Sequence, residues 1–276
     1  MSTQAPPIIT CQGISKRFQS GDDTVLALLD VDLEVRSGEF VVLLGPSGCG
    51  KSTLLYIMAG HLALSSGDLR MHGEPITGPS PARGVVFQDF ALFPWLSVRE
   101  NIAFGLSLRW ARGKADGRDA RVDGLVRMVG LQGFEKAKPH RLSGGMRQRV
   151  AIARTLAADP EVVLMDEPFG ALDAQTRDSM QRELMRIAAE TRKTIVFVTH
   201  SITEAALLAD RVVVLTARPG RIKEIVPIDL PRVRWNWRQE FSGQFLDVIG
   251  HLEELLGGEI QKSEAEEMGH GVGATT

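Results

Sequence analysis

Residues 40–55, FVVLLGPSGCGKSTLL, constrain the fold more than any other part of the chain. The apolar run 41–44 predicts a buried strand, which a glycine-rich turn and an apolar helical start then follow. This is the GxxxxGK[ST] pattern in its required context of strand, loop and helix. Glycines let the backbone curl so that its N–H groups point at phosphate oxygens, and the helix start adds the positive end of its dipole. The pattern therefore predicts a nucleoside triphosphate site.

Two polar side chains of this stretch have the chemistry that a bound triphosphate needs. The ammonium of Lys51 is expected to reach the β- and γ-phosphates, because it directly follows the glycine-rich turn. The hydroxyl of Ser52 is expected to ligate Mg²⁺. An ordinary glycine turn is the alternative, and the strand before it and the helix after it argue against that alternative.

Composition and charge exclude several classes of protein. The 276 residues are 43% hydrophobic and 24% charged, which indicates a soluble globular chain with one large domain or two small ones. The formal net charge of -2 gives no general attraction to nucleic acid. Two cysteines, Cys11 and Cys49, form no recognisable framework, which favours a reducing cytoplasm. Apolar runs stay short of the roughly 18 residues of a spanning helix, and residues 1–10 do not resemble a signal peptide. Any membrane role is therefore expected to be peripheral.

Apolar strands separated by helical stretches predict a mostly parallel α/β sheet. Residues 8–13 and 25–35 alternate apolar and polar side chains instead, which predicts an antiparallel sheet with one solvated face. Residues 97–142 have mostly helical spacing, with a charged, glycine-containing loop predicted at 112–121. Residues 1–7 are predicted to be disordered. The other predicted elements are a hairpin within 65–81 and core strands at 84–87, 162–165, 194–199 and 212–215.

A second chemical site is predicted where the strand VVLM ends in Asp166 and Glu167. In an open α/β sheet, ligands bind at the carboxyl ends of the strands. Asp166 is expected to hold Mg²⁺, usually through water, because this ion dehydrates reluctantly. Glu167 is expected to face an attacking water as its general base. A solvated turn is the usual explanation of an isolated Asp-Glu pair, but the preceding strand and the phosphate loop favour the functional one.

The segment LSGGMRQ at 142–148 precedes a strong helix. Ser143 is interpreted as its N-cap, and Gly144 and Gly145 allow an anion to approach the backbone N–H groups closely. One nucleotide does not need two phosphate-binding helix starts in one subunit. The second site is therefore expected to serve a neighbouring molecule.

The motifs occur in a specific order: the phosphate loop, Gln88 after a strand, LSGG, strand-Asp-Glu, Ala171-Leu172-Asp173 and His200. In this the chain resembles the ATP-binding subunit of an ABC transporter, over about residues 8 to 225. The resemblance implies the ABC ATPase nucleotide-binding fold, with a mostly parallel sheet, an N-terminal antiparallel β subdomain and a helical subdomain at about 97–142. The ATPase domain would span 8–232, and a C-terminal helical extension with a mobile tail would span 233–276.

The resemblance also implies roles for individual residues. In this family two subunits dimerise head to tail, and each ATP lies between the phosphate loop of one and the LSGG helix of the other. Gln88 would contact Mg²⁺ and the attacking water, Glu167 would be the base, and His200 would fix the γ-phosphate and that water. Asp173 would couple the two sites, and Phe18 would stack on adenine, although on spacing alone it is equally well a core residue. The residues that would hold the phosphates are Gly45, Pro46, Ser47, Gly48, Cys49, Gly50, Lys51, Ser52 and Thr53, and those closing over the partner's ATP are Ser143, Gly144 and Gly145.

Two positions of these motifs need separate comment. The usual signature ends in Gln where this chain has Met146, and a thioether cannot replace the hydrogen bonds of an amide. The backbone donors of the segment survive, so ATP closure is expected to remain intact. Cys49 is interpreted mainly as a small filler of the loop. A helix start can also lower the pKa of a thiol, so its alkylation is expected to slow hydrolysis.

The type of transporter is indicated by local stretches. DEPFGALD at 166–173 resembles importer subunits, while ITGPSPARGVVFQ at 76–88, LFPW at 92–95 and ARPGRI at 217–222 resemble the nitrate, sulfonate and taurine group. The implied function is ATP hydrolysis that powers uptake of a small anion of that type. The implied partners are a second copy of the chain and two integral membrane permease subunits, which would dock at the Gln88 loop and the helical region after it. An extracytoplasmic solute-binding protein would act indirectly, and no nucleic acid is implied. The implied location is peripheral, at the cytoplasmic face of the plasma (inner) membrane.

The same motifs are also compatible with other classes of ATPase. An ABC exporter or lipid-transport ATPase would share the catalytic residues, and a soluble ABC ATPase of ribosomes or DNA is more remote, because this chain has one set of motifs and no sustained heptads. A phosphate-loop kinase would leave LSGG and His200 without a task. The stretch RVRWNWR at 232–238 is expected to form packing aromatics, with contact to lipid headgroups as the alternative.

Overall fold

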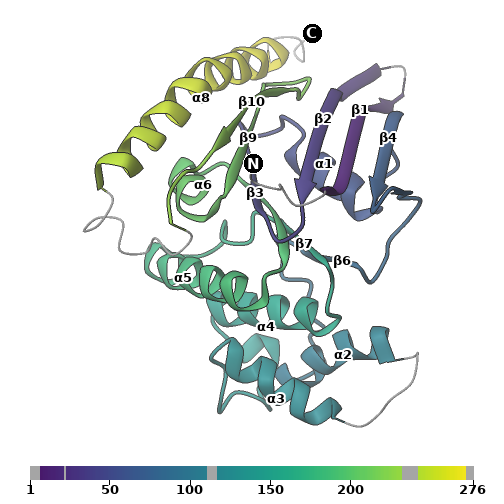
Figure 1. Cartoon of the computed structure of the whole chain (residues 1–276), viewed down its shortest axis with the longest axis vertical. Coiled ribbons are helices and arrows are strands. Elements are labelled where there is room, and N and C mark those ends of the chain that lie inside the picture. Colours follow the sequence, from purple (N-terminus) through teal and green to yellow (C-terminus); the bar gives the residue numbers. More distant parts are fainter. Residues whose placement is uncertain (1–6, 22, 111–116, 232–241, 272–276) are drawn as a thin grey trace, which may run out of the picture. The chain divides into compact units, whose positions relative to one another are not determined.

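The computed structural model describes residues 7–21, 23–110, 117–231 and 242–271. The chain forms two compact units (Figure 1). Unit 1 contains the residues up to Gly78 and those from Val196 on, and unit 2 runs from Pro79 to Ile195. Most of the predicted disordered segment 1–7 and the whole of RVRWNWR lie outside the described residues.

Unit 1 contains a four-stranded antiparallel sheet in the order β2-β1-β4-β5. Strand β1 pairs antiparallel with both β2 and β4, with Cys11 opposite Leu33 and opposite Leu69. Alternation along β2 buries Val31, Leu33 and Val35, as expected of a sheet with one solvated face. The predicted antiparallel sheet and hairpin are confirmed. The bounds are β1 Pro7–Ser20, β2 Asp23–Arg36, β4 Ser66–Met71 and β5 Glu74–Pro75.

The second sheet of unit 1 positions the phosphate loop. Strands β3 and β9 pair in parallel, with Val41 opposite Arg211, and β10 pairs antiparallel with β9. Every residue of β3 is buried, so its uninterrupted apolar sequence is that of a strand covered on both faces. Helix α6 packs on β3, and α8 packs on α6 and β9 (Figure 1). The bounds are β3 Phe40–Leu44, α1 Lys51–Ala59, β8 Thr194–Thr199, α6 Ile202–Leu208, β9 Arg211–Leu215, β10 Ile222–Pro227 and α8 Ser242–Gly271.

Unit 2 combines two parallel strands with a group of helices. Strand β6 pairs in parallel with β7, with Val86 opposite Met165. Helix α4 lies at the centre of the unit and packs against α2, α3, α5 and β6 (Figure 1). A Cβ at Gly105 of α2 would overlap the carbonyl of Arg154 on α4, so this close helix crossing requires a glycine. The bounds are β6 Arg83–Val86, α2 Val98–Trp110, α3 Arg118–Met128, the 3₁₀ helix Pro139–Arg141, α4 Gly144–Ala157, β7 Val162–Asp166 and α5 Ala174–Thr191.

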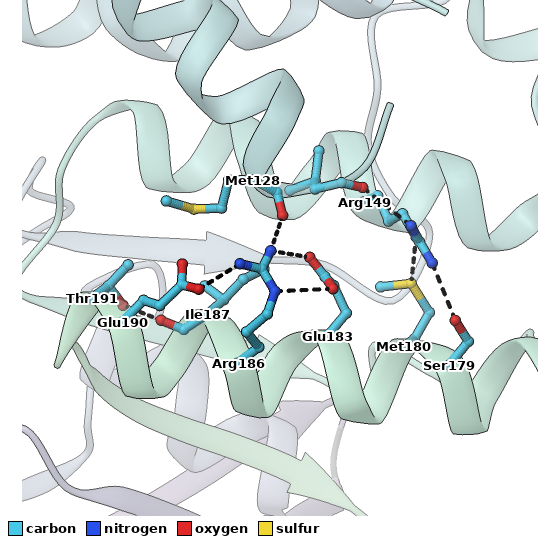
Figure 2. A network of polar contacts seen from close by, with 10 residues as sticks. Met128, Arg149, Ser179, Met180, Glu183, Arg186, Ile187, Glu190 and Thr191 are labelled. Atoms are coloured by element: carbon cyan, nitrogen blue, oxygen red, sulfur yellow. Dashed lines mark hydrogen bonds and ion pairs between the residues drawn. The ribbon is translucent and has the colours of Figure 1, made fainter. Parts of the chain in front are cut away.

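Two arginines fix the carboxyl end of α3 (Figure 2). Arg186 of α5 donates to the carbonyl of Met128, while Glu183 and Glu190 on either side of it accept from the same guanidinium at 2.6 and 2.5 Å. Arg149 of α4 donates to the carbonyl of Val129 at 3.2 Å. The last carbonyls of a helix lack intrahelical donors, and cations are favoured there by the helix dipole. These contacts therefore join α3 to both α4 and α5.

The structure differs from the sequence-based expectation in two helices. The loop predicted at 112–121 is already helical from Arg118, where α3 begins. The mobile tail is predicted from Gly257 on, yet helix α8 continues through Gly257 and Gly258 to Gly271. Glu259, directly beyond these glycines, is held by hydrogen bonds to Ala217 and Lys223. In the described part of the chain, no helix is both long enough and apolar enough to cross a membrane.

Candidate functional site

The phosphate loop, residues 45–53, connects β3 to α1 in unit 1. Gly48 and Gly50 have φ of +72° and +100°, the left-handed region that glycine enters without steric cost. A Cβ at Gly50 would lie 2.7 Å from a methyl carbon of Leu28 and 2.9 Å from the carbonyl of Ala27. Gly50 is the N-cap of α1 and has no side chain to cover the first N–H groups of the helix. The loop thus presents a helix start suited to phosphate oxygens.

Lys51 is held inside this curl. Its side chain is buried, and its Nζ donates to the carbonyls of Gly45 at 2.9 Å and Pro46 at 2.7 Å. A buried ammonium needs such acceptors, because desolvation of an unpaired charge is costly. Ser52 and Thr53 follow in the first turn of α1 and are partly exposed. The ammonium and the Ser52 hydroxyl therefore stand at the same helix start.

Cys49 corrects one expectation. Cys49 is 1% exposed. Burial raises the pKa of its thiol by more than the neighbouring Lys51 lowers that pKa. The expected lowering of this pKa by the helix start is therefore wrong, and the thiol is protonated at neutral pH. The interpretation as a small filler agrees with the structure, because a Cβ at Gly45 would lie 2.8 Å from the Cys49 sulfur. The effect of alkylation on hydrolysis stays a prediction.

Phe18 and His200 are also presented by unit 1. Phe18 lies on β1 and is 39% exposed, so the alternative that it is a core residue is wrong. The ammonium of Lys16 lies 4.9 Å from the centroid of its ring. His200 is exposed directly after β8, and the next residue, Ser201, caps α6 by accepting the N–H of Glu204 at 3.3 Å. Stacking on adenine and contact with the γ-phosphate stay predictions.

In unit 2, the two predicted carboxylates stand at the carboxyl end of β7. Asp166 is the last residue of this strand and is 4% exposed. Glu167 follows with φ of +39°, a strained conformation for a residue with a Cβ and one that concentrates at functional sites. A Cβ placed on Gly170 would lie 3.8 Å from Nε2 of Gln88 and 3.8 Å from Oε2 of Glu167. The structure therefore brings Gln88 and Glu167 to the same small residue.

The segment predicted as a second anion site lies where α4 and α5 begin side by side. The hydroxyl of Ser143 accepts the backbone N–H of Met146 at 3.3 Å, which confirms the predicted N-cap. A Cβ at Gly145 would overlap the methyl group of Thr176, so the glycine allows α4 to approach α5. Asp173 caps α5 through the N–H of Thr176 at 3.0 Å, and this backbone hydrogen bond lowers the pKa of its carboxyl. The cap thus uses the backbone N–H of Met146, and the expectation that ATP closure survives without the usual Gln side chain stays a prediction.

Two groups that position the loop after Gln88 are not recognised from the sequence. Arg154 of α4 donates to the carbonyls of Ala91 at 2.6 Å and Phe90 at 3.2 Å, and both of those residues have positive φ. Asn101 is fully buried, accepts the N–H of Phe93 at 3.0 Å and donates to the carbonyl of Phe93 at 3.2 Å. The signal for Arg154 is its position two helical turns after Arg147, whose guanidinium lies 5.4 Å from the centroid of the Phe90 ring.

Comparison with known proteins identifies the family. The model of the ABC transporter family matches residues 28–170. The chain belongs to the ABC transporter family. A taurine import ATP-binding protein of Roseobacter denitrificans is 53% identical over 264 residues, which cover 91% of this chain and 97% of that protein. An aliphatic sulfonates import ATP-binding protein of Bacillus cereus is 44% identical over 255 residues, which cover 92% of this chain and 99% of that protein.

Solved structures agree with this assignment. A dimeric ATP-binding cassette in a post-hydrolysis state, bound to ADP and Pi, matches with a TM-score of 0.71 at 31% identity, over 81% of this chain and all of that one. The chain therefore has the ABC ATPase nucleotide-binding fold and is an ATPase. This confirms the family, the fold and the class of enzyme expected from the motifs. The roles of the single residues stay predictions.

Proposed function

We propose that this ABC ATPase powers the uptake of a small anion of the sulfonate, taurine or nitrate type through partner membrane subunits. Relatives named for import of taurine and of aliphatic sulfonates match about nine tenths of the chain, and this is the observation that carries the proposal. The stretches at 76–88, 92–95 and 217–222 support the same group of importers. Solute choice lies mainly in the membrane subunits and the solute-binding protein.

The reaction is ATP hydrolysis by in-line attack of water at the γ-phosphate. Glu167 takes the proton of that water, and Gln88 and His200 orient it. Gln88 and Glu167 reach the same glycine in unit 2, which supports their joint action. Lys51 offsets the charge that develops on the phosphate oxygens. Its ammonium is already held inside the phosphate loop by two carbonyls, so little reorganisation is needed.

Mg²⁺ fits the oxygen-rich donors that the chain offers. Asp166 contributes a nearly buried carboxylate, Ser52 a hydroxyl and Gln88 an amide oxygen. Mg²⁺ is typically bound by only a few protein oxygens together with the phosphates of the substrate. When bound, Mg²⁺ neutralises charge on the β- and γ-phosphates. Ser52 and Asp166 would hold it, and Gln88 would join them.

The second anion site supports a head-to-tail homodimer. Ser143, Gly144 and Gly145 would close over the ATP of the partner subunit, and Asp173 beside them would couple the two sites. The capped start of α4 keeps backbone N–H groups directed outward at this point. A similar cassette is described as dimeric, which supports dimerisation of this chain.

The loop after Gln88 supports docking of the two permease subunits. Phe93 packs between Trp95 and Phe104, with ring centroids 5.6 and 4.6 Å away, and those two outer rings are 66% and 39% exposed. Trp95 lies on the loop and Phe104 on α2, and exposed aromatic side chains on such a firmly held surface are suited to receive a helix of another chain. The ATPase would thus act peripherally at the cytoplasmic face of the plasma (inner) membrane, with the solute-binding protein acting indirectly from the other side.

Native mass spectrometry of the complex, extracted with mild detergent from its own membranes, tests this function. Two copies of this chain with two copies of a membrane subunit are expected, and vesicles containing that complex should take up the anion only with ATP on the side of this chain. Recovery on ribosomes or DNA would contradict transport and leave the ATPase assignment standing. Transport out of the cytoplasm by the same complex would support an exporter or lipid transporter instead.

A further inference from the structure

The C-terminal helix α8 is anchored by a buried carboxylate. The helix packs on α6 and β9, and its buried residues follow helical spacing along one face. Within residues 242–263, whose side chains are described, the last of them is Glu259, which is 3% exposed. A buried charge is costly unless it is paired and hydrogen-bonded, so the partners of this carboxylate show what holds the helix end. The buried residues of this described part of α8 are Phe245, Leu252, Leu256 and Glu259.

Three donors satisfy Glu259. Its Oε2 accepts the backbone N–H of Ala217 at 2.9 Å, and its Oε1 accepts the ammonium groups of Lys223 and Lys262 at 3.0 Å each. Burial acts to raise the pKa of Glu259, but these hydrogen bonds outweigh it and lower the pKa to about 2. The carboxylate is therefore ionised throughout the neutral range and binds Ala217 as a charged acceptor.

Ala217 belongs to the β9–β10 turn, residues 216–221. The turn is closed by Thr216, whose N–H donates to the carbonyl of Arg221 at 2.9 Å and whose hydroxyl donates to the carbonyl of Pro219 at 2.9 Å. The same hydroxyl accepts the N–H of Arg221 at 3.0 Å. These hydrogen bonds make the turn internally rigid. The hydrogen bond from Ala217 to Glu259 therefore fixes the position of the whole turn.

The β9–β10 turn also contacts the phosphate loop. The guanidinium of Arg218 donates to the carbonyl of Gly48 at 3.3 Å. Gly220 lies so close to the carbonyl of Cys49 that a Cβ on it would overlap that oxygen. The N–H of Gly220 donates to the carbonyl of Ala27 on β2 at 2.9 Å. The turn is thus tied to α8 at Ala217 and touches two consecutive residues of the phosphate loop.

We propose that Glu259 is a positioning residue for ATP binding, which acts through the β9–β10 turn on Gly48 and Cys49. The proposal rests on the assignment of the phosphate loop as the ATP site and makes α8 a determinant of ATP affinity. The N–H groups of the loop bind phosphate best when their directions are set before the ligand arrives. Loss of the carboxylate leaves the N–H of Ala217 without its acceptor, and the turn then supports the loop less firmly.

Titration of the full-length chain with methylanthraniloyl-ATP, a fluorescent analogue, tests this role. Glu259→Ala is expected to raise the Kd about tenfold, equivalent to about 1.4 kcal/mol. The KM for ATP should rise in parallel while kcat changes by less than about twofold, because binding is lost and the chemical step is untouched. Glu253→Ala is the matched control, since Glu253 is an exposed residue of the same helix. Its Kd should equal that of the wild type.

Two further variants separate positioning from general loosening of α8. Leu252→Ala removes a buried contact without touching the bonds of Glu259 and should lower the Tm with little change in Kd. Arg218→Ala should raise the Kd by itself and add little in the Glu259→Ala background, because both act on the same turn. Glu259→Gln keeps an acceptor for the N–H of Ala217 and should bind the ATP analogue more tightly than Glu259→Ala. It replaces Glu259→Ala in the titration if that variant does not fold.

Two results would overturn the proposal. One is an unchanged Kd in Glu259→Ala beside a wild type that binds the analogue well, which would leave the ATP site assignment intact. The other is an equal rise of Kd in Leu252→Ala at a matched loss of Tm, which would make the effect one of stability alone. Failure of the wild type to bind better than Lys51→Ala would instead contradict the ATP site itself, and this proposal with it.

Discussion

The side-chain amide of Gln88 and the carboxylate of Glu167 meet at Gly170, each with an atom 3.8 Å from the point where a Cβ of that residue would stand. These two side chains come from segments almost eighty residues apart, one after β6 and one after β7. The parallel pairing of those strands brings their carboxyl ends to the same edge. A water held by the amide would therefore lie within reach of Glu167, the proposed general base.

Glu167→Gln tests this arrangement. The amide keeps the shape of the side chain but cannot take a proton, so kcat should fall by about 10²–10⁴ while ATP affinity is kept. The ATP-bound dimer should then accumulate, which size-exclusion chromatography with ATP can measure. Glu161→Gln, at the other end of β7, is the control and should turn over normally. Unchanged kcat in Glu167→Gln would refute its role as base.

Lys51→Ala should abolish binding of ATP. We expect the buried ammonium to bind the phosphates, and its removal also leaves the carbonyls of Gly45 and Pro46 without their donor. Saturating ATP should raise the Tm of the wild type by about 5–10 °C, as expected for ligand at roughly 100 times its Kd. The variant should show no such rise. An equal ligand-induced shift in both proteins would contradict the role of Lys51.

Arg154→Lys should loosen the loop after Gln88. Arginine reaches the carbonyls of Phe90 and Ala91 with two arms of one planar group, and lysine cannot reproduce that fork. Amide hydrogen exchange in residues 88–97 should become about tenfold faster, equivalent to about 1.4 kcal/mol of local stability, while ATP affinity stays unchanged. Arg192→Lys, at the exposed end of α5, serves as control. Exchange rates equal to those of the wild type would show that other contacts hold the loop.

Arg186→Ala should destabilise the chain. The change removes the donor to Met128 and leaves Glu183 and Glu190 facing each other without their shared cation (Figure 2). A loss of about 1–3 kcal/mol corresponds to a fall in Tm of roughly 3–8 °C. Arg182→Ala, at an exposed position of the same helix, should change the Tm by less than about 1–2 °C. Similar melting of both variants would contradict the importance of this contact.

The Glu259 contact should also give a pH-dependent stability. The folded-state pKa of about 2 lies below the ordinary value of the carboxyl, so its stabilisation is complete above about pH 4.5 and is lost as the pH falls toward 2. The groups that face it are the ammonium groups of Lys223 and Lys262 and the N–H of Ala217. The Tm difference between the wild type and Glu259→Gln should therefore be constant from pH 5 to 8 and shrink at pH 3.5. A difference that grows on acidification would contradict the assignment.

Most of the features that could be predicted are local motifs, formed by residues close to one another in the sequence. The phosphate loop, the N-cap Ser143 and the strand ending in Asp166 are local patterns, because each needs only a strand, a tight turn and a helix start in succession. The antiparallel pairing of β1 and β2 follows from alternation along each strand. The family and the fold followed from the order of these motifs, since several local patterns in one order specify far more than any one of them alone.

Tertiary structure alone decided the features that depend on distant partners. The pKa of Cys49 is raised because packing buries the thiol, which outweighs the helix start that the sequence suggests. Helix α8 continues through Gly257 and Gly258 although glycine disfavours helices, because Glu259 beyond them is bound by Ala217 and Lys223. The hydrogen bonds from Arg154 to the loop after Gln88 join residues more than sixty positions apart in the sequence. Local propensity is visible in the amino-acid order, whereas desolvation and long-range hydrogen bonds exist only once the chain has packed.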